Sequence, residues 1–188
     1  MNLSIVLRYG IMAVAVVALV FVTQAFVVKP YRIPSTSMEP TLMVGDRVLV
    51  NRLVYHFRSV RRGDIVVFKW PGNRKIVFVK RAIGLPGDTL SISDGHLYVN
   101  GVMQTESYVA RQDGQPLPTL AASDMGGSLA VKGWSLQEPY KVPAGHYFMM
   151  GDNRAVSDDS RVWGPISKSD IIGAAFFIYW PLGRIKVL

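Results

Sequence analysis

An uncharged apolar run near the N-terminus constrains this chain more than any other feature. Between Arg8 and Lys29 the sequence reads YGIMAVAVVALVFVTQAFVV, in which only Thr23 and Gln24 are clearly polar. A helix of about 20 apolar residues can cross a hydrocarbon core about 30 Å thick. The run therefore predicts one N-terminal transmembrane helix over residues 9–28.

A cleavable secretory signal is the alternative interpretation of this run. Arg8, in the flank over residues 1–8, would be its basic region, and the small residue before Phe26 loosely matches a cleavage site. The apolar run continues past that position, which favours an anchor. The basic residues after the run would by themselves place the rest of the chain in the cytoplasm, but long trailing domains override such charge counts.

Composition excludes several classes of protein. The 188 residues carry a net charge of +8, which suits an anionic membrane surface or a nucleic acid. The basic residues are scattered, without zinc-finger or RNP-like spacing, so the membrane surface is the better interpretation and no nucleic acid is expected. The absence of cysteine excludes disulfides, thiolate metal sites and a cysteine nucleophile.

The chain after residue 29 has the pattern of an antiparallel β protein. Short runs rich in Val, Ile, Phe and Tyr are bounded by Gly, Pro, Asp or Asn. The expected strands are DRVLV, DIVVFKW, KIVFVKRAI, TLSIS, HLYV, HYFMM and IIGAAFFIYW. Asp94-Gly95 between two of these runs predicts a hairpin. The fold class is therefore mostly β over residues 29–188, preceded by the helix.

Two segments depart from this simple pattern. Residues 101–142 are polar and rich in Gly, Ser and Pro, which indicates an inserted small subdomain or loop whose role the sequence does not reveal. The apolar run over residues 171–182 is too short for a second membrane span. A buried strand is favoured there over a surface that touches the membrane.

A cluster of hydroxyls is the first candidate for chemistry. The stretch IPSTSMEPTL contains Ser35, Thr36 and Ser37 in succession. A serine hydrolase needs a base and a stabiliser for the oxyanion. None of the three histidines lies in a G-x-S-x-G setting, and no H-E-x-x-H pair is present for zinc. No metal or cofactor is expected.

Lys80 is the alternative base. If its segment is a strand, Ile76, Phe78 and Lys80 share one face, so the ammonium lies among apolar groups, where burial disfavours its charge. Lowering its pKa from about 10.4 to about 7.5 corresponds to roughly 4 kcal/mol, which burial can supply. A surface lysine beside Arg81 is the competing interpretation.

Five motifs in order resemble those of type I signal peptidases. They are PSTSMEPTL, VGDRVLVNRL, RRGDIVVF, VKRAIGLPGD and GDNRAVSDDSRVWGPI, behind an N-terminal span. The resemblance implies that Ser37 is the nucleophile and Lys80 the general base. It also implies that Ser35, with the backbone N–H of Ser37, forms the oxyanion hole, whereas Thr36 has no catalytic role.

The last motif supplies the supporting residues that the resemblance implies. Ser157 would accept a hydrogen bond from the lysine amine and orient it, and Asp159 and Arg161 would support this wall of the site. The family often has an Asp and a second polar residue at the two positions after Arg154, where this chain has Ala155-Val156. That departure puts the outer hydrogen bonds in doubt and leaves the dyad intact.

The resemblance also implies the substrate and its location. The substrates would be signal peptides of exported preproteins, cut after small residues at positions −3 and −1, on the extracytoplasmic side of a bacterial inner membrane, without an obligate protein partner. An anchor raises the effective concentration of a membrane-bound substrate. Extended peptide would pair with strand edges, at the residues Ile33, Pro34, Met38, Phe78 and Val79.

Three rival interpretations remain. A relative specialised for one pilin or conjugation precursor would share every motif. A non-catalytic, membrane-tethered binding module is disfavoured because Ser37 and Lys80 are both present. A soluble Ser/Lys autoprotease of the repressor type is disfavoured by the predicted anchor and by the lack of a DNA-binding element.

Overall fold

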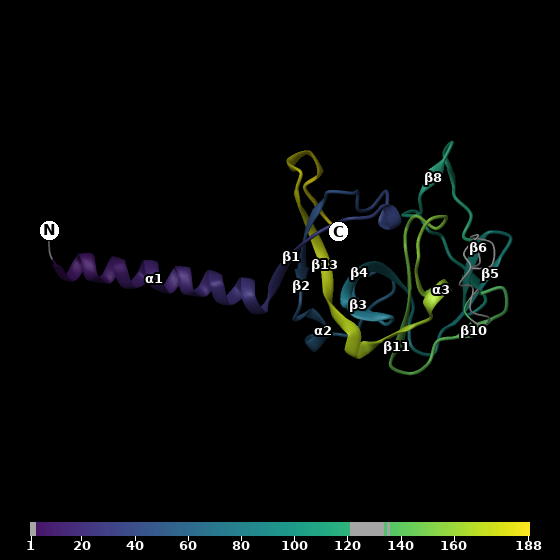
Figure 1. Cartoon of the computed structure of the whole chain (residues 1–188), viewed down its shortest axis with the longest axis horizontal. Helices are drawn as coiled ribbons and strands as arrows, with labels where there is room; N and C mark the ends of the chain where they lie inside the picture. The colour runs from purple at the N-terminus through teal and green to yellow at the C-terminus, as the bar shows by residue number, and fades with distance from the viewer. Residues whose placement is uncertain (1–2, 121–133, 135) are drawn as a thin grey trace.

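The computed structural model describes residues 3–120, 134 and 136–188 and is mostly β. Figure 1 shows the single long helix α1 extending away from a body of strands. The elements are α1 (Leu3–Phe26), β1 (Val28–Arg32), η1 (Thr36–Met38), β2 (Arg47–Asn51), α2 (Val54–Phe57), β3 (Ile65–Trp70), β4 (Asn73–Gly84), β5 (Thr89–Ser93), β6 (His96–Val99), β7 (Val102–Met103), β8 (Arg111–Gln112), β9 (Gln115–Pro116), β10 (Tyr140–Lys141), β11 (His146–Met150), α3 (Ser160–Trp163), β12 (Ile166–Ser167), η3 (Lys168–Asp170), β13 (Ile171–Trp180), η4 (Leu182–Arg184) and β14 (Lys186–Val187).

The larger sheet contains the strands that surround the hydroxyl cluster. Its order is β1-β2-β13-β3-β4-β11-β12, with β14 paired to β13, and its neighbouring strands are antiparallel. β13 lies between β2 and β3, and Ala175 and Ile178 are buried in the core. The predicted buried strand is thus present, while Phe176 and Trp180 on it are 38% and 47% exposed.

The smaller sheet packs against the end of β4. Its order is β10-β5-β6-β7, and Leu90, Leu97 and Phe148 join the two sheets in one hydrophobic cluster. A Cβ at Gly84 would lie 2.7 Å from Leu90 Cδ1 and 2.9 Å from Phe148 Cβ, so only glycine permits this close approach. The end of β4 can therefore pack closely against the smaller sheet.

The predicted hairpin is confirmed. β5 and β6 pair from Ser93 opposite His96, and the turn residues Asp94 and Gly95 have φ of 50° and 75°. Positive φ at both central residues suits Asp-Gly in a two-residue turn. All seven predicted strands are present, with bounds that differ by no more than two residues from the predicted ones.

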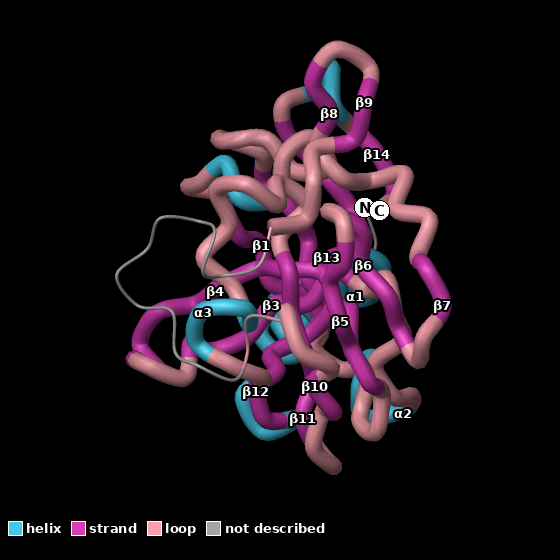
Figure 2. The backbone as a smooth tube through the Cα atoms, turned by 90° about the vertical axis from the view of Figure 1, so that its right-hand side faces the viewer, coloured by secondary structure: helices cyan, strands magenta, loops and turns pink. Residues whose placement is uncertain are grey.

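The polar segment 101–142 is partly built into the smaller sheet. β10 near its end pairs with β5, and the β8–β9 hairpin projects from the body (Figure 2). Residues 121–133 and 135 lie outside the described residues. The short strands of this segment could not be predicted from its sequence, because each has only two residues.

The N-terminal helix covers most of the apolar run. α1 ends at Phe26, and Val28 already belongs to β1, where it pairs with Asn51. β1 is an edge strand, which accommodates Pro30. Among residues 3–120, 134 and 136–188, no helix is both long enough and apolar enough to cross a membrane. The anchor over residues 9–28 stays a prediction.

Candidate active site

The loop between β1 and β2 presents Ser37 at the edge of the core. Ser37 is in the short 3-10 helix η1, and the next residue, Met38, is fully buried. Asn153 N donates to the carbonyl of Ser37 at 3.1 Å, which ties this loop to the segment after β11. Burial of Met38 and this backbone bond fix the direction of the Ser37 side chain.

Lys80 reaches Ser37 from the neighbouring part of β4. Its Nζ lies 2.6 Å from Ser37 Oγ, although 43 positions separate the two residues. Lys80 is 4% exposed, and its Nζ lies 5.7 Å from the centroid of the Phe78 ring. The predicted common face of Phe78 and Lys80 is therefore present, and the surface-lysine interpretation is wrong.

Burial changes the acid–base chemistry of this lysine. Removal from water lowers the pKa of Lys80 from 10.5 to about 8. The carboxylates of Asp159 and Asp158 raise this pKa by a smaller amount, Arg161 lowers it, and Asp152 raises it. About a tenth of the amine is thus neutral at pH 7, and this form can accept a proton from Ser37 across the 2.6 Å contact.

Ser35 lies next to the nucleophile candidate. The two hydroxyl oxygens of Ser35 and Ser37 are 3.3 Å apart. The amides in the first turn of a 3-10 helix have no acceptor within that helix, so the Ser37 N–H is available for a ligand oxygen. Thr36 lies between them and its carbonyl accepts a bond from Asn153.

Ser157 is close to the site but does not form the implied bond. Its Oγ is buried and has no hydrogen-bond partner among the described residues, so the bond from Lys80 that the resemblance implies is not formed here. A Cβ on Gly151 would lie 2.2 Å from Ser157 Oγ and 2.3 Å from Ser37 O. Only glycine lets these three backbone segments meet.

Asp159 and Arg161 form a fully buried ion pair behind Ser157. Arg161 Nε and Nη2 donate to Asp159 Oδ1 and Oδ2, both at 2.9 Å, and Gly151 N donates to Oδ2 at 3.0 Å. Burial alone would raise the pKa of Asp159, but Arg161 holds it below its usual value. Arg161 also donates to the carbonyl of Leu120 at 2.7 Å. The predicted support of this wall is geometrically in place.

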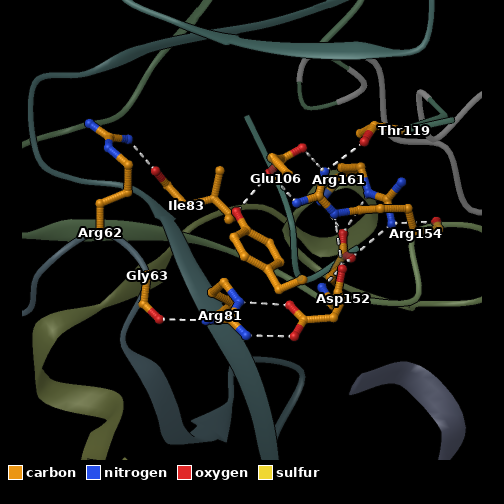
Figure 3. A network of polar contacts seen from close by, with 12 residues as sticks. Arg62, Gly63, Arg81, Ile83, Glu106, Thr119, Asp152, Arg154 and Arg161 are labelled. Atoms are coloured by element: carbon orange, nitrogen blue, oxygen red, sulfur yellow. Dashed lines mark hydrogen bonds and ion pairs between the residues drawn. The ribbon is translucent and has the colours of Figure 1, made fainter. Parts of the chain in front are cut away.

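A second pair, which the sequence did not single out, lies between Arg81 and Asp152 (Figure 3). Arg81 Nε and Nη2 donate to Asp152 Oδ1 and Oδ2 at 2.8 and 2.6 Å. Thr41 Oγ1 donates to Asp152 Oδ2 at 2.5 Å. Arg81 follows Lys80 on β4, and Thr41 is in the loop that carries Ser37. The pair therefore fixes the lysine strand against the serine loop.

A third pair comes from the polar segment. Arg154 Nη1 and Nη2 donate to Glu106 Oε2 and Oε1 at 2.8 and 2.5 Å, and Nη1 also donates to Thr119 Oγ1 at 2.6 Å. Tyr108 Oη donates to Glu106 at 2.8 Å, and its ring centroid lies 4.0 Å from the Arg81 guanidinium carbon. Glu106 could not be predicted as a site residue, because nothing in its local pattern indicates a buried partner 48 positions away.

A small cavity lies between β4 and the end of β1. It has a volume of about 40 Å³, and Ile33, Pro34, Phe78 and Val79 are among its lining residues. Four of the five predicted substrate-binding residues are thus brought together. Met38 does not line the cavity and has no exposed surface, since it packs in the core.

One edge of β4 is open beside this cavity. β11 pairs with β4 only between Arg81 and Gly84, whereas β3 pairs along Asn73–Arg81. Over the described strands, the edge at Ile76–Val79 that faces away from β3 has no partner. Such an edge can accept an extended peptide by backbone hydrogen bonds.

Nothing in the described part of the chain resembles a metal site. No group of three or more His, Asp or Glu side chains there is placed to hold a metal ion. The chemistry that the arrangement offers is that of a buried amine beside a hydroxyl.

Comparison with known proteins gives one consistent family. The sequence profile described as "Signal peptidase, peptidase S26" matches residues 6–180. Signal peptidase I of Pseudomonas aeruginosa is 38% identical over 94% of this chain and 74% of its own length. Probable signal peptidase I-2 of Synechocystis sp. is 37% identical over 97% and 77%, and signal peptidase IB of Staphylococcus aureus is 39% identical over 93% and 88%.

A solved structure also matches. A signal peptidase I from Enterococcus faecalis V583 aligns over 62% of this chain and 97% of its own, with 33% identity and a TM-score of 0.49.

The pKa of Lys80 predicts how activity depends on pH. The logarithm of kcat/KM is expected to rise with slope 1 below about pH 8 and to level off above it, because the neutral amine is the active form. Asp158→Asn removes a carboxylate that raises this pKa, so its midpoint is expected at lower pH. The measurement is a pH–rate profile on a precursor peptide.

Asp113→Asn, on the exposed β8–β9 turn, is the matched control and should keep the midpoint of the intact protein. A midpoint above pH 10, or a shift to higher pH in Asp158→Asn, would contradict the assignment of Lys80 as the titrating base.

The Arg154–Glu106 pair predicts a stability effect far from the dyad in sequence. Glu106→Gln leaves the fully buried Arg154 guanidinium without its counter-charge, so unfolding free energy is expected to fall by about 3 kcal/mol. The exposed Glu138→Gln is the control and should change it by less than about 0.5 kcal/mol. Urea denaturation of both variants measures the difference, and equal stabilities would show that the pair contributes little.

Proposed function

Because this chain belongs to the bacterial type I signal peptidases of peptidase family S26, we propose that it removes N-terminal signal peptides from exported preproteins by a Ser37/Lys80 mechanism. The members of this family are serine hydrolases. The observation that carries the proposed mechanism is the buried 2.6 Å contact between Lys80 Nζ and Ser37 Oγ.

In the acylation step, Ser37 Oγ attacks the carbonyl carbon of the scissile bond. Its proton passes to the neutral amine of Lys80, and the carbonyl oxygen becomes an oxyanion. The Ser35 hydroxyl and the Ser37 N–H are the proposed donors to that oxyanion, where one donor typically contributes about 3 to 4 kcal/mol to lowering the barrier. The lysine then gives its proton to the leaving amine, so the C–N bond breaks and an ester on Ser37 remains.

In the deacylation step, water replaces the leaving amine. Lys80 takes a proton from this water as its oxygen attacks the ester carbonyl. Collapse of the second oxyanion releases the carboxylic acid, and the proton returns to Ser37 Oγ. The Arg81–Asp152 pair supports both steps because it holds the strand that carries Lys80 against the loop that carries Ser37.

The small cavity supports selection of small side chains. At about 40 Å³ it can hold a side chain such as that of alanine, and an extended peptide along the open edge of β4 would direct alternate side chains to one face. We therefore propose cleavage after small residues at positions −3 and −1. Ile33, Pro34, Phe78 and Val79 are the proposed walls, whereas full burial of Met38 makes its contribution structural.

We further propose that α1 holds the β domain at the bacterial inner membrane as a single-pass anchor, with the domain on the extracytoplasmic side. The side chains described along α1 support this, because those of the large apolar residues are 45% to 70% exposed. Exposed apolar surface of this extent is typical of contact with lipid or another protein. The side of the membrane follows only from the resemblance to signal peptidases.

A specialist that processes one pilin or conjugation precursor is the alternative within the same family. It would share the dyad and differ in the range of sequences cut. A panel of unrelated precursors separates the two, since the specialist would cleave one of them and the general enzyme most.

The dyad is tested by cleavage of a purified precursor with an Ala-x-Ala site, in detergent, with product termini read by mass spectrometry. Ser37→Ala and Lys80→Ala are expected to lower kcat by on the order of 10⁴-fold or more. Ser35→Ala is expected to lower it by about 10² to 10³-fold.

Two matched controls accompany these variants. Thr36→Ala removes the middle hydroxyl of the same triplet, and Lys75→Ala removes an exposed lysine from the same strand. Both should cleave like the intact protein. Cleavage by Lys80→Ala at the rate of Lys75→Ala would overturn the proposed base.

A further inference from the structure

The end of the chain returns to the loop that carries Ser37. After β13 come η4 and then β14, which pairs back on β13. Leu188 N donates to the carbonyl of Phe176 at 3.0 Å, so the last residue is held in the sheet. Figure 1 shows the C-terminus beside β13, within the body of strands. Because the chain is held on both sides of η4, this short helix has a fixed place against the body.

Arg184 in η4 forms an ion pair with Asp46, 138 positions away. Its Nε donates to Asp46 Oδ1 at 2.9 Å, and its Nη2 donates to Oδ2 at 3.0 Å. The side chain of Asp46 is 1% exposed and that of Arg184 is 36% exposed. A buried carboxylate is costly unless a cation and hydrogen bonds compensate for it, so Asp46 depends on this guanidinium.

Asp46 also closes the base of the serine loop, which comprises residues 33–46. Ile33 N donates to the carbonyl of Asp46, and Gly45 N donates to the carbonyl of Ile33, both at 2.9 Å. Met43 N donates to the Asp46 side chain, at 2.9 Å from Oδ2. The same carboxylate therefore accepts hydrogen bonds from η4 and from the backbone of the serine loop.

A further contact of Arg184 reaches closer to the dyad. Its Nη2 donates to the carbonyl of Thr41 at 3.4 Å. Thr41 Oγ1 in turn donates to Asp152 Oδ2 at 2.5 Å. The Asp152 carboxylate also accepts from Arg81, which follows Lys80 on β4. Thr41 thus joins η4 to the strand that carries the proposed base.

We propose that Arg184 is a positioning residue for acylation, which holds the serine loop where Ser37 Oγ meets Lys80 Nζ. The inference rests on the proposed Ser37/Lys80 mechanism. The serine loop carries the nucleophile and the proposed oxyanion donors, whereas the walls of the small cavity come mostly from β1, β2, β3 and β4. A shift of the loop therefore affects the transition state more than the binding of the peptide. A misplacement of about 1 Å can lower a rate by about 10²-fold.

The test compares Arg184→Gln with the intact chain in the precursor assay, in detergent, at a temperature below the unfolding of every variant. kcat is expected to fall by about tenfold or more while KM stays within about twofold, because the lost interaction acts in the transition state. Arg184→Lys restores a charge opposite Asp46 without the planar fork that also reaches Thr41, so it should recover only part of the loss.

Arg62→Gln is the matched control for the loss of an ion pair. Arg62 likewise pairs with one carboxylate, since its Nη2 lies 2.9 Å from Asp88 Oδ2, and it donates to one carbonyl, that of Ile83. Its side chain is 32% exposed, close to the value for Arg184. Both variants should lower Tm, whereas only Arg184→Gln should lower kcat. Equal kcat values for the two variants would overturn the positioning role.

Hydrogen exchange gives a readout that does not depend on cleavage. Asn153 N donates to the carbonyl of Ser37 at 3.1 Å, so its exchange reports on the place of the serine loop. The reference is the amide of Lys168, which donates to the carbonyl of Gly145 at 2.9 Å. Relative to this reference, Arg184→Gln is expected to speed exchange at Asn153 by about tenfold.

The two readouts together decide the proposal. Arg62→Gln should leave the ratio of the two exchange rates unchanged. Faster exchange at Asn153 in Arg184→Gln with kcat retained would overturn the proposal, as would an unchanged ratio. If Arg184→Gln does not fold, Arg184→Lys is used for both measurements. Failure of the proposed function looks different, because the intact chain would then cleave no precursor, while exchange would still show whether Arg184 holds the serine loop.

Discussion

The contact between Lys80 Nζ and Ser37 Oγ is the interaction on which the rest of this site depends. It requires an ammonium-bearing side chain to sit in the protein interior at 4% exposure. Lowering its pKa from 10.5 to about 8 corresponds to about 3 kcal/mol in favour of the neutral amine. Because the folded pKa lies below the unfolded one, this penalty on stability is fully present below about pH 8 and fades as pH rises toward 10.5. The rest of the fold therefore has to offset the cost of keeping this amine in the interior.

Buried arginine–carboxylate pairs surround this contact. Arg81–Asp152 joins the lysine strand to the serine loop, and Asp159–Arg161 forms the wall behind Ser157. Buried pairs of this kind contribute little net stability compared with apolar packing, but breaking one leaves an uncompensated charge. Their value here is geometric, because Arg81–Asp152 joins two segments 71 positions apart and Arg161, held by Asp159, also donates to the carbonyl of Leu120.

The sequence predicted what depends on local pattern. Alternating Val, Ile and Phe gave the seven strands, and the shared face of Phe78 and Lys80 followed from strand periodicity alone. The roles of Ser37 and Lys80 came from the resemblance, because local pattern does not say which hydroxyl meets which base. Ser157 shows the limit of that approach, since its implied hydrogen bond to Lys80 is not formed.

Long-range polar contacts could not be predicted. Asp152 pairs with a residue 71 positions away, and Glu106 with one 48 positions away, so neither has a periodic signal. The polar composition around Glu106 indicated only a loop. Its importance follows from burial of Arg154, which is visible only in three dimensions.

The most direct test of the account is an NMR titration of the lysine side chains in the intact protein, observed at ¹³Cε and assigned by comparison with Lys80→Arg. One resonance, absent from the variant, is expected to titrate with a midpoint near pH 8. A Lys80 resonance that titrates at the ordinary lysine value of 10.5 would show that the amine is almost fully charged at neutral pH and would contradict its proposed role as the base for Ser37.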